Sequence, residues 1–216
     1  MIYKVELLTE ENYKPTFWSG GMATELTTYP LNSDYASRNF LWRLGIAKID
    51  IPESTFSSLP KVSRKLMVIE GKITLHHENK YKKLLNSFEQ DDFMGNWITK
   101  TYGKASVFNL MTRENYNGEI LHLNINPNKQ LQFNYKTPLN KDLVSICFYT
   151  VSGGFNTTIN DKVFETAKND LIVINCVNSC YAHEFVLSNN TSEITDILVI
   201  IITSFTCDTV LRNYSK

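Results

Sequence analysis

A chain of 216 residues with 43% apolar and 20% charged side chains has the composition of a folded globular protein and not of a disordered one. Its 22 basic and 22 acidic side chains cancel, which argues against a nucleic-acid partner, because such binding needs clustered lysine and arginine. The most apolar run, residues 197–205, is far shorter than the roughly 20 residues that cross a bilayer, and no signal-peptide pattern precedes it. We therefore expect a cytoplasmic protein that binds neither nucleic acid nor membrane.

Short runs of strand-forming residues follow one another along the chain, separated by Asn, Gly, Asp and Pro. In residues 17–30, FWSGGMATELTTYP, we interpret Gly20-Gly21 as a bend that needs positive φ or a close backbone approach. Residues 65–85 predict a strand, a turn at Gly71, a second strand, a polar tip and a third strand. Further strands are expected at 42–51, 105–113, 119–125, 142–153, 155–166, 170–177, 182–187 and 197–205. This spacing predicts an all-β sandwich or barrel.

The hairpin after Gly71 shows weak sequence similarity to a segment later in the chain. GKITLHHENKY, which begins at Gly71, aligns with GGFNTTINDKV, which begins at Gly153, and each copy turns at glycine and reverses at a polar tip. Two copies of one β module fit this chain length. The polar segment 124–142 carries two prolines, so we expect one domain over residues 1–128 and a second over 129–216.

Metal and nucleophile motifs are weak. His76 and His77 are adjacent on a predicted strand, so they point to opposite faces, and Cys176 and Cys180 have no matching ligand pair. We expect no metal, no cofactor and reduced cysteines. Neither a G-x-G-x-x-G fingerprint, a P-loop nor a G-x-S-x-G elbow is present. The acidic pair Asp91-Asp92 lies in a polar segment, and we interpret it as solvated.

The arginines carry more information, because lysines far outnumber them. Arg43 would share a strand face with Gly45, Ala47 and Ile49, and so project into a barrel. A buried arginine needs a partner. Glu25 and an anionic ligand are equally good candidates for it.

Four sequence blocks occur together in this order: FWSGGMATEL, NFLWRLGIAKID, TFSSLPKVSRKLMVIEGKITL and FMGNWITKTYGKASVFNLMTR. They resemble the HutD/Ves family from residue 15 to about 125, and more loosely to the C-terminus. The resemblance implies a bicupin, that is, two cupin-like (double-stranded β-helix) barrels with few or no long helices. It also implies a link to histidine utilisation or stress responses, and a regulatory or ligand-sensing role. The chain departs from the family block at Ser19 and Met22, beside the glycine pair.

Our leading hypothesis is non-catalytic binding of a small anionic metabolite, a carboxylate, in the N-terminal barrel. Arg43 and Arg64 would supply positive charge, and Trp18 and Trp42 would form walls of the pocket. Thr24, Glu25 and Asn109 would orient the ligand or an arginine by hydrogen bonds. One alternative is a metal-independent isomerase or hydrolase of small acids with Glu25 as general base. Another is a structural or interaction protein that forms a homodimer and has no pocket.

Overall fold

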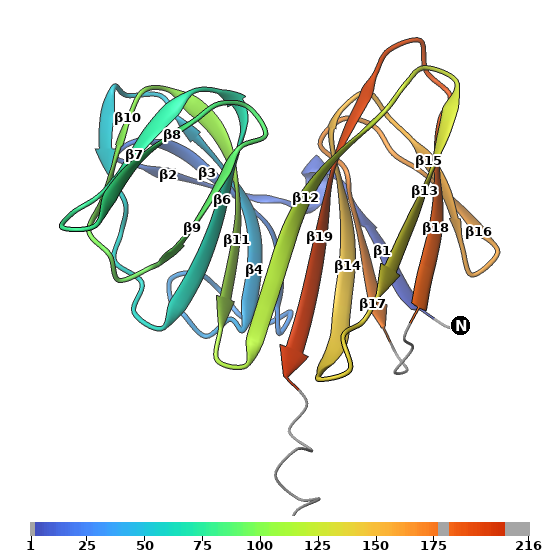
Figure 1. Ribbon diagram of the computed structural model, residues 1–216, viewed down its shortest axis with the longest axis horizontal. Helices are drawn as coiled ribbons and strands as arrows, with labels where there is room; N and C mark the ends of the chain where they lie inside the picture. The colour runs from blue at the N-terminus through green and yellow to red at the C-terminus, as the bar shows by residue number, and fades with distance from the viewer. Residues whose placement is uncertain (1–2, 177–181, 206–216) are drawn as a thin grey trace, which may run out of the picture. The chain divides into compact units, whose positions relative to one another are not determined.

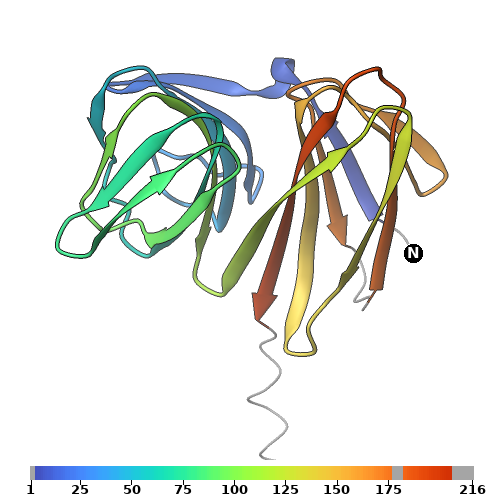
Figure 2. The same ribbon diagram turned by 45° about the horizontal axis from the view of Figure 1, so that its top comes forward.

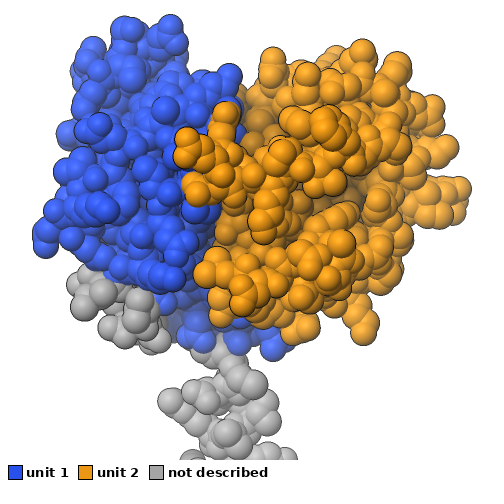
Figure 3. All heavy atoms as spheres, turned by 180° about the vertical axis from the view of Figure 1, so that it is seen from behind, with its two compact units in different colours: residues 1–9, 115–216 blue, residues 10–114 orange. Residues whose placement is uncertain are grey.

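The computed structural model describes residues 3–176 and 182–205, and within them the regular elements are nineteen β-strands and one short 3-10 turn, Glu10–Asn12. The predicted all-β class is therefore confirmed. The chain divides into two compact units (Figures 1 and 3): unit 1 is residues 1–9 and 115–216, and unit 2 is residues 10–114. Within the described ranges, no helix has the length and apolar character needed to cross a membrane.

Unit 2 consists of a six-stranded and a four-stranded antiparallel sheet, packed face to face (Figures 1 and 2). The larger sheet has the order β2-β3-β4-β11-β6-β9, and the smaller has the order β5-β10-β7-β8. The bounds are β2 Lys14–Trp18, β3 Gly21–Tyr29, β4 Trp42–Ile49, β5 Glu53–Thr55, β6 Val62–Gly71, β7 Ile73–His77, β8 Tyr81–Leu85, β9 Gln90–Met94, β10 Thr99–Tyr102 and β11 Ala105–Arg113.

Unit 1 pairs a five-stranded sheet, β1-β17-β14-β19-β12, with a four-stranded sheet, β13-β18-β15-β16. The bounds are β1 Tyr3–Leu8, β12 Tyr116–Ile125, β13 Lys129–Lys136, β14 Lys141–Ser152, β15 Asn156–Ile159, β16 Lys162–Glu165, β17 Leu171–Cys176, β18 Ala182–Asn189 and β19 Thr195–Phe205.

The two units repeat one arrangement of eight strands. Adding eight to each strand number converts β4-β11-β6-β9 into β12-β19-β14-β17, and β5-β10-β7-β8 into β13-β18-β15-β16. Gly71 and Gly153 stand at equivalent turns with φ of 87° and 69°, values that favour glycine. The weak internal sequence similarity therefore corresponds to a structural repeat. Strands β2 and β3 are additional to the repeat in unit 2, and β1 is additional to it in unit 1.

The units do not end where the sequence suggested. β12 precedes the expected boundary at residue 128, yet it pairs with β19 of unit 1. The polar segment 124–142, in which the boundary was expected, contains β13, which pairs with β18 and buries Phe133. Most side chains of β13 face solvent, so its composition resembles that of a linker. β1 also belongs to unit 1, because it pairs with β17 although all of unit 2 lies between these two strands in the sequence.

The interiors of the two units differ in chemistry. Among the described residues, unit 1 contains a large apolar cluster with five phenylalanines: Phe133, Phe148, Phe155, Phe164 and Phe185. The apolar clusters described in unit 2 are smaller, and its buried residues include Arg43, Arg64 and Asn109. Buried polar groups of this kind need partners, and they are the starting point for the functional site.

Candidate functional site

A cavity of about 360 Å³ opens inside unit 2. Its wall comes from alternate residues of β2, β3 and β11, from residues 43 and 45–47 of β4, from Arg64 on β6, and from two connecting segments, residues 34–36 and 56–57. Of the seven residues expected to bind ligand, the structure brings five together here: Trp18, Glu25, Arg43, Arg64 and Asn109.

Strand register explains why these side chains meet. Met111 on β11 lies opposite Arg43 on β4 and opposite Arg64 on β6, so the two arginines flank it in one row. The next row contains Gly45 on β4, with Glu25 and Asn109 on either side of it. Side chains two residues apart on a strand share a face. The two rows therefore face the cavity together.

Arg43 and Glu25 form a buried ion pair, which confirms the predicted internal partner. The Arg43 Nε donates a hydrogen bond of 2.8 Å to Glu25 Oε2. Gly45 leaves room for this pair, since a Cβ there would lie 3.1 Å from Arg43 Nη1. On another side, the Tyr35 ring centre lies 4.8 Å from the Arg43 guanidinium carbon.

Arg64 is buried and has no acidic partner among the residues that the structure describes. Its Nη2 donates a hydrogen bond of 3.0 Å to Asn109 Oδ1, while its buried Nε has no acceptor. The guanidinium lies over the rings of Phe56 and Phe93, at 4.5 and 5.1 Å. Burial lowers the pKa of Arg64 to about 10. The side chain nevertheless stays charged near neutral pH.

Trp18 reaches the cavity because of the glycine pair that follows it. Trp18 pairs with Gly21 at the end of the β2–β3 hairpin, and its ring packs over Gly20, where a Cβ would lie 2.1 Å from the ring. Gly21 has a φ of 149°, and a Cβ there would lie 2.1 Å from the Lys48 carbonyl oxygen. The interpretation of the pair as a bend with close backbone approach is confirmed. The buried Trp18 Nε1 has no acceptor.

The segment between β3 and β4 forms part of the cavity wall and was not anticipated as such. Asp34 accepts hydrogen bonds from the backbone N and the hydroxyl of Ser37, and these bonds hold the pKa of Asp34 below its usual value. Fully buried Phe40 anchors the end of the segment. Tyr35 and Phe56 join the lining from connecting segments, where strand periodicity gives no signal.

Thr24 and Trp42 lie outside the cavity, which corrects the expected lining. Each is adjacent in sequence to a lining residue, Glu25 or Arg43, and successive side chains of a strand point to opposite faces. Trp42 is buried and stacks on Tyr29, with 5.8 Å between ring centres. Trp42 and Arg43 are neighbours on one strand, so they cannot both face the same pocket.

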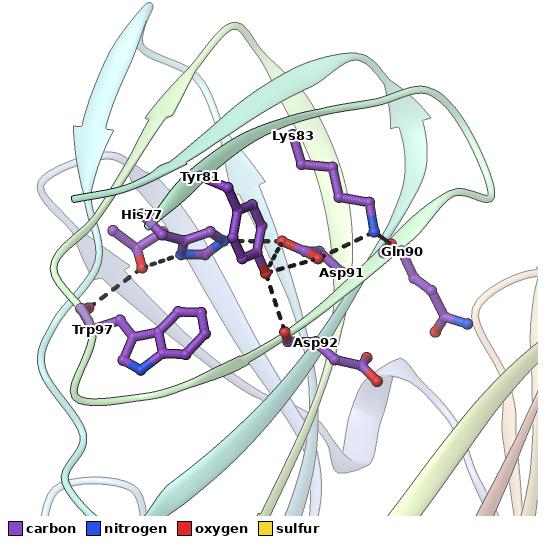
Figure 4. Close-up of polar contacts among 8 residues, drawn as sticks. His77, Tyr81, Lys83, Gln90, Asp91, Asp92 and Trp97 are labelled. Carbon is purple, nitrogen blue, oxygen red and sulfur yellow. Dashed lines mark hydrogen bonds and ion pairs between the residues drawn. The ribbon is translucent and has the colours of Figure 1, made fainter. Parts of the chain in front are cut away.

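A second polar cluster in unit 2 was missed, because Asp91 was interpreted as solvated (Figure 4). The buried Asp91 carboxylate accepts a hydrogen bond from His77 Nε2 at 2.9 Å, and others from the Tyr81 hydroxyl and Lys83 Nζ. His77 Nδ1 lies 2.9 Å from the Thr99 hydroxyl. Burial, and then the charge of Asp91, raises the pKa of Tyr81 to about 12, so its hydroxyl remains a donor. The Thr99 hydroxyl, the His77 imidazole and the Asp91 carboxylate form a hydrogen-bonded series. Because His77 and Thr99 are fully buried, a substrate could not reach this series.

The cavity does not fit a divalent cation. Its lining contains three cationic side chains and no histidine, and within residues 3–176 and 182–205 no group of three or more His, Cys, Asp and Glu side chains could hold a metal ion. His76 and His77 lie on opposite faces of β7, as predicted. Cys147 and Cys176 are free thiols, and burial raises the pKa of Cys147; Cys180 and Cys207 lie outside the described residues.

Comparison with known proteins identifies relatives of this architecture. A family model described as HutD matches residues 10–187. PA5104 from Pseudomonas aeruginosa PAO1, described as a conserved protein of unknown function, superposes with a TM-score of 0.76 at 16% identity, covering 94% of this chain and 100% of that one. HutD from Pseudomonas fluorescens SBW25, in a formate condition, gives a TM-score of 0.71 at 16% identity with the same coverage.

A mutant of the oxalate decarboxylase from Bacillus subtilis has a TM-score of 0.68 at 8% identity, over 93% of this chain and 78% of that one. At this identity the likeness concerns the fold, which is the predicted bicupin. No curated protein matches the chain by sequence.

Proposed function

The chain belongs to the HutD family, and on that premise we propose that unit 2 binds a small carboxylate and that the protein acts as a ligand-responsive regulator without catalysing a reaction. One observation carries the proposal: Arg64 is buried beside a cavity, is charged, and has an Nε without an acceptor. A buried charge without a counter-charge is strongly unfavourable. A bound carboxylate would supply both the charge and the missing acceptor.

The remaining lining supports a small organic acid over a bare inorganic ion. Trp18, Tyr35 and Phe56 offer apolar ring surface, and the buried Trp18 Nε1 is a second donor that lacks an acceptor. Pockets of this size and mixed lining are typical of small-molecule sites. The family's association with histidine utilisation makes carboxylates from histidine breakdown the first candidates.

Thermal unfolding with a panel of small carboxylates tests the proposal. A ligand at 100 times its Kd should stabilise unit 2 by about 2.7 kcal/mol, which raises Tm by roughly 2–4 °C per kcal/mol for a chain of this size. Failure of every carboxylate to raise Tm would contradict the proposal.

Arg64→Met gives a sharper test. We expect it to abolish the ligand-induced shift while leaving the ligand-free protein as stable as before or more stable, by up to about 4 kcal/mol, since an apolar side chain replaces an uncompensated charge. Arg113→Met is the matched control, because Arg113 lies in the same unit and does not line the cavity. A strong loss of stability in ligand-free Arg64→Met would indicate a purely structural arginine.

A further inference from the structure

The charges that face the cavity fall into a buried set and a set at its mouth. Arg43, Arg64 and Glu25 are buried or nearly so, with the Glu25 side chain 11% exposed. Lys14 and Asp34 also line the cavity but are exposed, and their charges cancel. The buried set therefore carries a net charge of plus one, and water screens the mouth.

Glu25 already pairs with Arg43, the arginine that a second carboxylate of a ligand would need. Its Oε2 accepts from Arg43 Nε, and its Oε1 lies 4.0 Å from Lys14 Nζ. Arg43 is further confined by the Tyr35 ring and by the backbone of Gly45. Arg64, two strands away in the same row, is the buried cation without a carboxylate partner in the described chain.

From this arrangement we infer that the site selects monocarboxylates against dicarboxylates, and that Glu25 is the residue that determines this selectivity. The inference rests on the proposed function and names its ligand class. One carboxylate neutralises Arg64. A second carboxylate on the same ligand would bring an extra negative charge into a buried space that already contains Glu25, and like charges placed together without water repel strongly.

Glu25 thus has two effects on the site. It holds Arg43 in a fixed position, and it neutralises the charge of Arg43, so that this charge does not attract an anionic ligand. Replacing the carboxylate by an amide separates these effects, because glutamine keeps a side-chain oxygen that can accept from Arg43 Nε. The Glu25→Gln site would hold two uncompensated guanidinium groups and would suit a dianion.

Isothermal titration calorimetry with butanoate and succinate, which have equal chain length, tests the inference. The wild type should bind butanoate at least about tenfold more tightly than succinate. In Glu25→Gln, succinate affinity should rise by about tenfold or more, while butanoate affinity changes much less.

Two further variants are controls. Glu25→Asp keeps the negative charge and should retain the preference for butanoate. Asp50→Asn removes one negative charge from an exposed side chain of unit 2 that does not line the cavity, and should alter the preference by no more than about twofold.

The outcomes distinguish the two proposals. Equal affinity of the wild type for both ligands, or an unchanged preference in a folded Glu25→Gln, would overturn the selectivity inference and leave carboxylate binding intact. Binding of neither ligand to any variant would overturn both.

Discussion

Asp91 and Asp92 are adjacent in the sequence but lie in opposite surroundings. The Asp91 side chain is 5% exposed, and it accepts hydrogen bonds from three neighbouring side chains (Figure 4). Asp92 is 56% exposed and pairs with Lys65 at the surface. Both lie on β9, where alternation turns one carboxylate toward His77 and the other toward solvent.

This contrast leads to a prediction with a built-in control. Asp91→Ala should destabilise unit 2 by about 3–5 kcal/mol, because it leaves the fully buried His77 without its carboxylate partner. Asp92→Ala should change stability by at most about 1 kcal/mol, as expected for an exposed pair. Chemical denaturation of both variants measures the difference. Similar losses in the two would refute the assignment of Asp91 to a buried network.

At the scale of one element, the β2–β3 hairpin shows how local backbone chemistry positions the site. Its turn places Trp18 at the cavity, and β3 then continues to Glu25 in register with β4. The turn is possible only because Gly21 adopts a positive φ and lies against the Lys48 carbonyl.

Substitution at this turn should affect both the fold and the site. Gly21→Ala should cost about 1–3 kcal/mol for the unfavourable φ alone, and the contact with Lys48 should add to this. We also expect weaker carboxylate binding, since the shift moves Trp18. Circular dichroism melts and calorimetric titrations provide the two measurements. An alanine variant that melts and binds like the wild type would show that the hairpin does not depend on this glycine.

At the scale of the whole molecule, one strand arrangement occurs twice with two different interiors. In unit 1, the inward positions of β19 are Ile197, Val199 and Ile201, within a continuous apolar cluster. In unit 2, the equivalent strand β11 directs Val107, Asn109 and Met111 into the cavity. Unit 1 thus gains stability from an apolar core at these positions, whereas the equivalent positions of unit 2 border a cavity with buried polar groups.

The position of β1 gives a prediction for the molecule as a whole. Leu7 precedes unit 2 in sequence but packs on the core of unit 1 through the β1–β17 pairing. Leu7→Asp places an unpaired charge against that core. Hydrogen exchange should therefore increase in β17 and β14, with β3 and β4 protected as before. Loss of protection in β3 and β4 instead would contradict the assignment of β1 to unit 1.

The sequence alone was sufficient for the fold class, most strand positions and the repeat. Alternation of apolar and polar residues and turn-forming residues at regular spacing are local properties, and they predicted β6, β7, β8 and β11 with nearly the observed bounds. Local periodicity failed where a strand is mostly solvent-exposed. The polar segment that contains β13 was therefore expected to hold the domain boundary, which the structure places before β12 instead.

The buried charged residues of the site, Glu25, Arg43 and Arg64, were named from the sequence, whereas its full lining depends on how the strands and connecting segments pack. A buried arginine needs a partner, and Glu25 was one of the two expected for Arg43, the other being an anionic ligand; the structure shows the Arg43–Glu25 pair. Strand register excluded Thr24 and Trp42, since a shift of one residue reverses the face of a strand. Tertiary packing added Tyr35 and Phe56 from connecting segments, and it left Arg64 without a counter-charge within the described chain. The absence of a partner depends on every neighbouring element at once, so no local pattern in the sequence could reveal it.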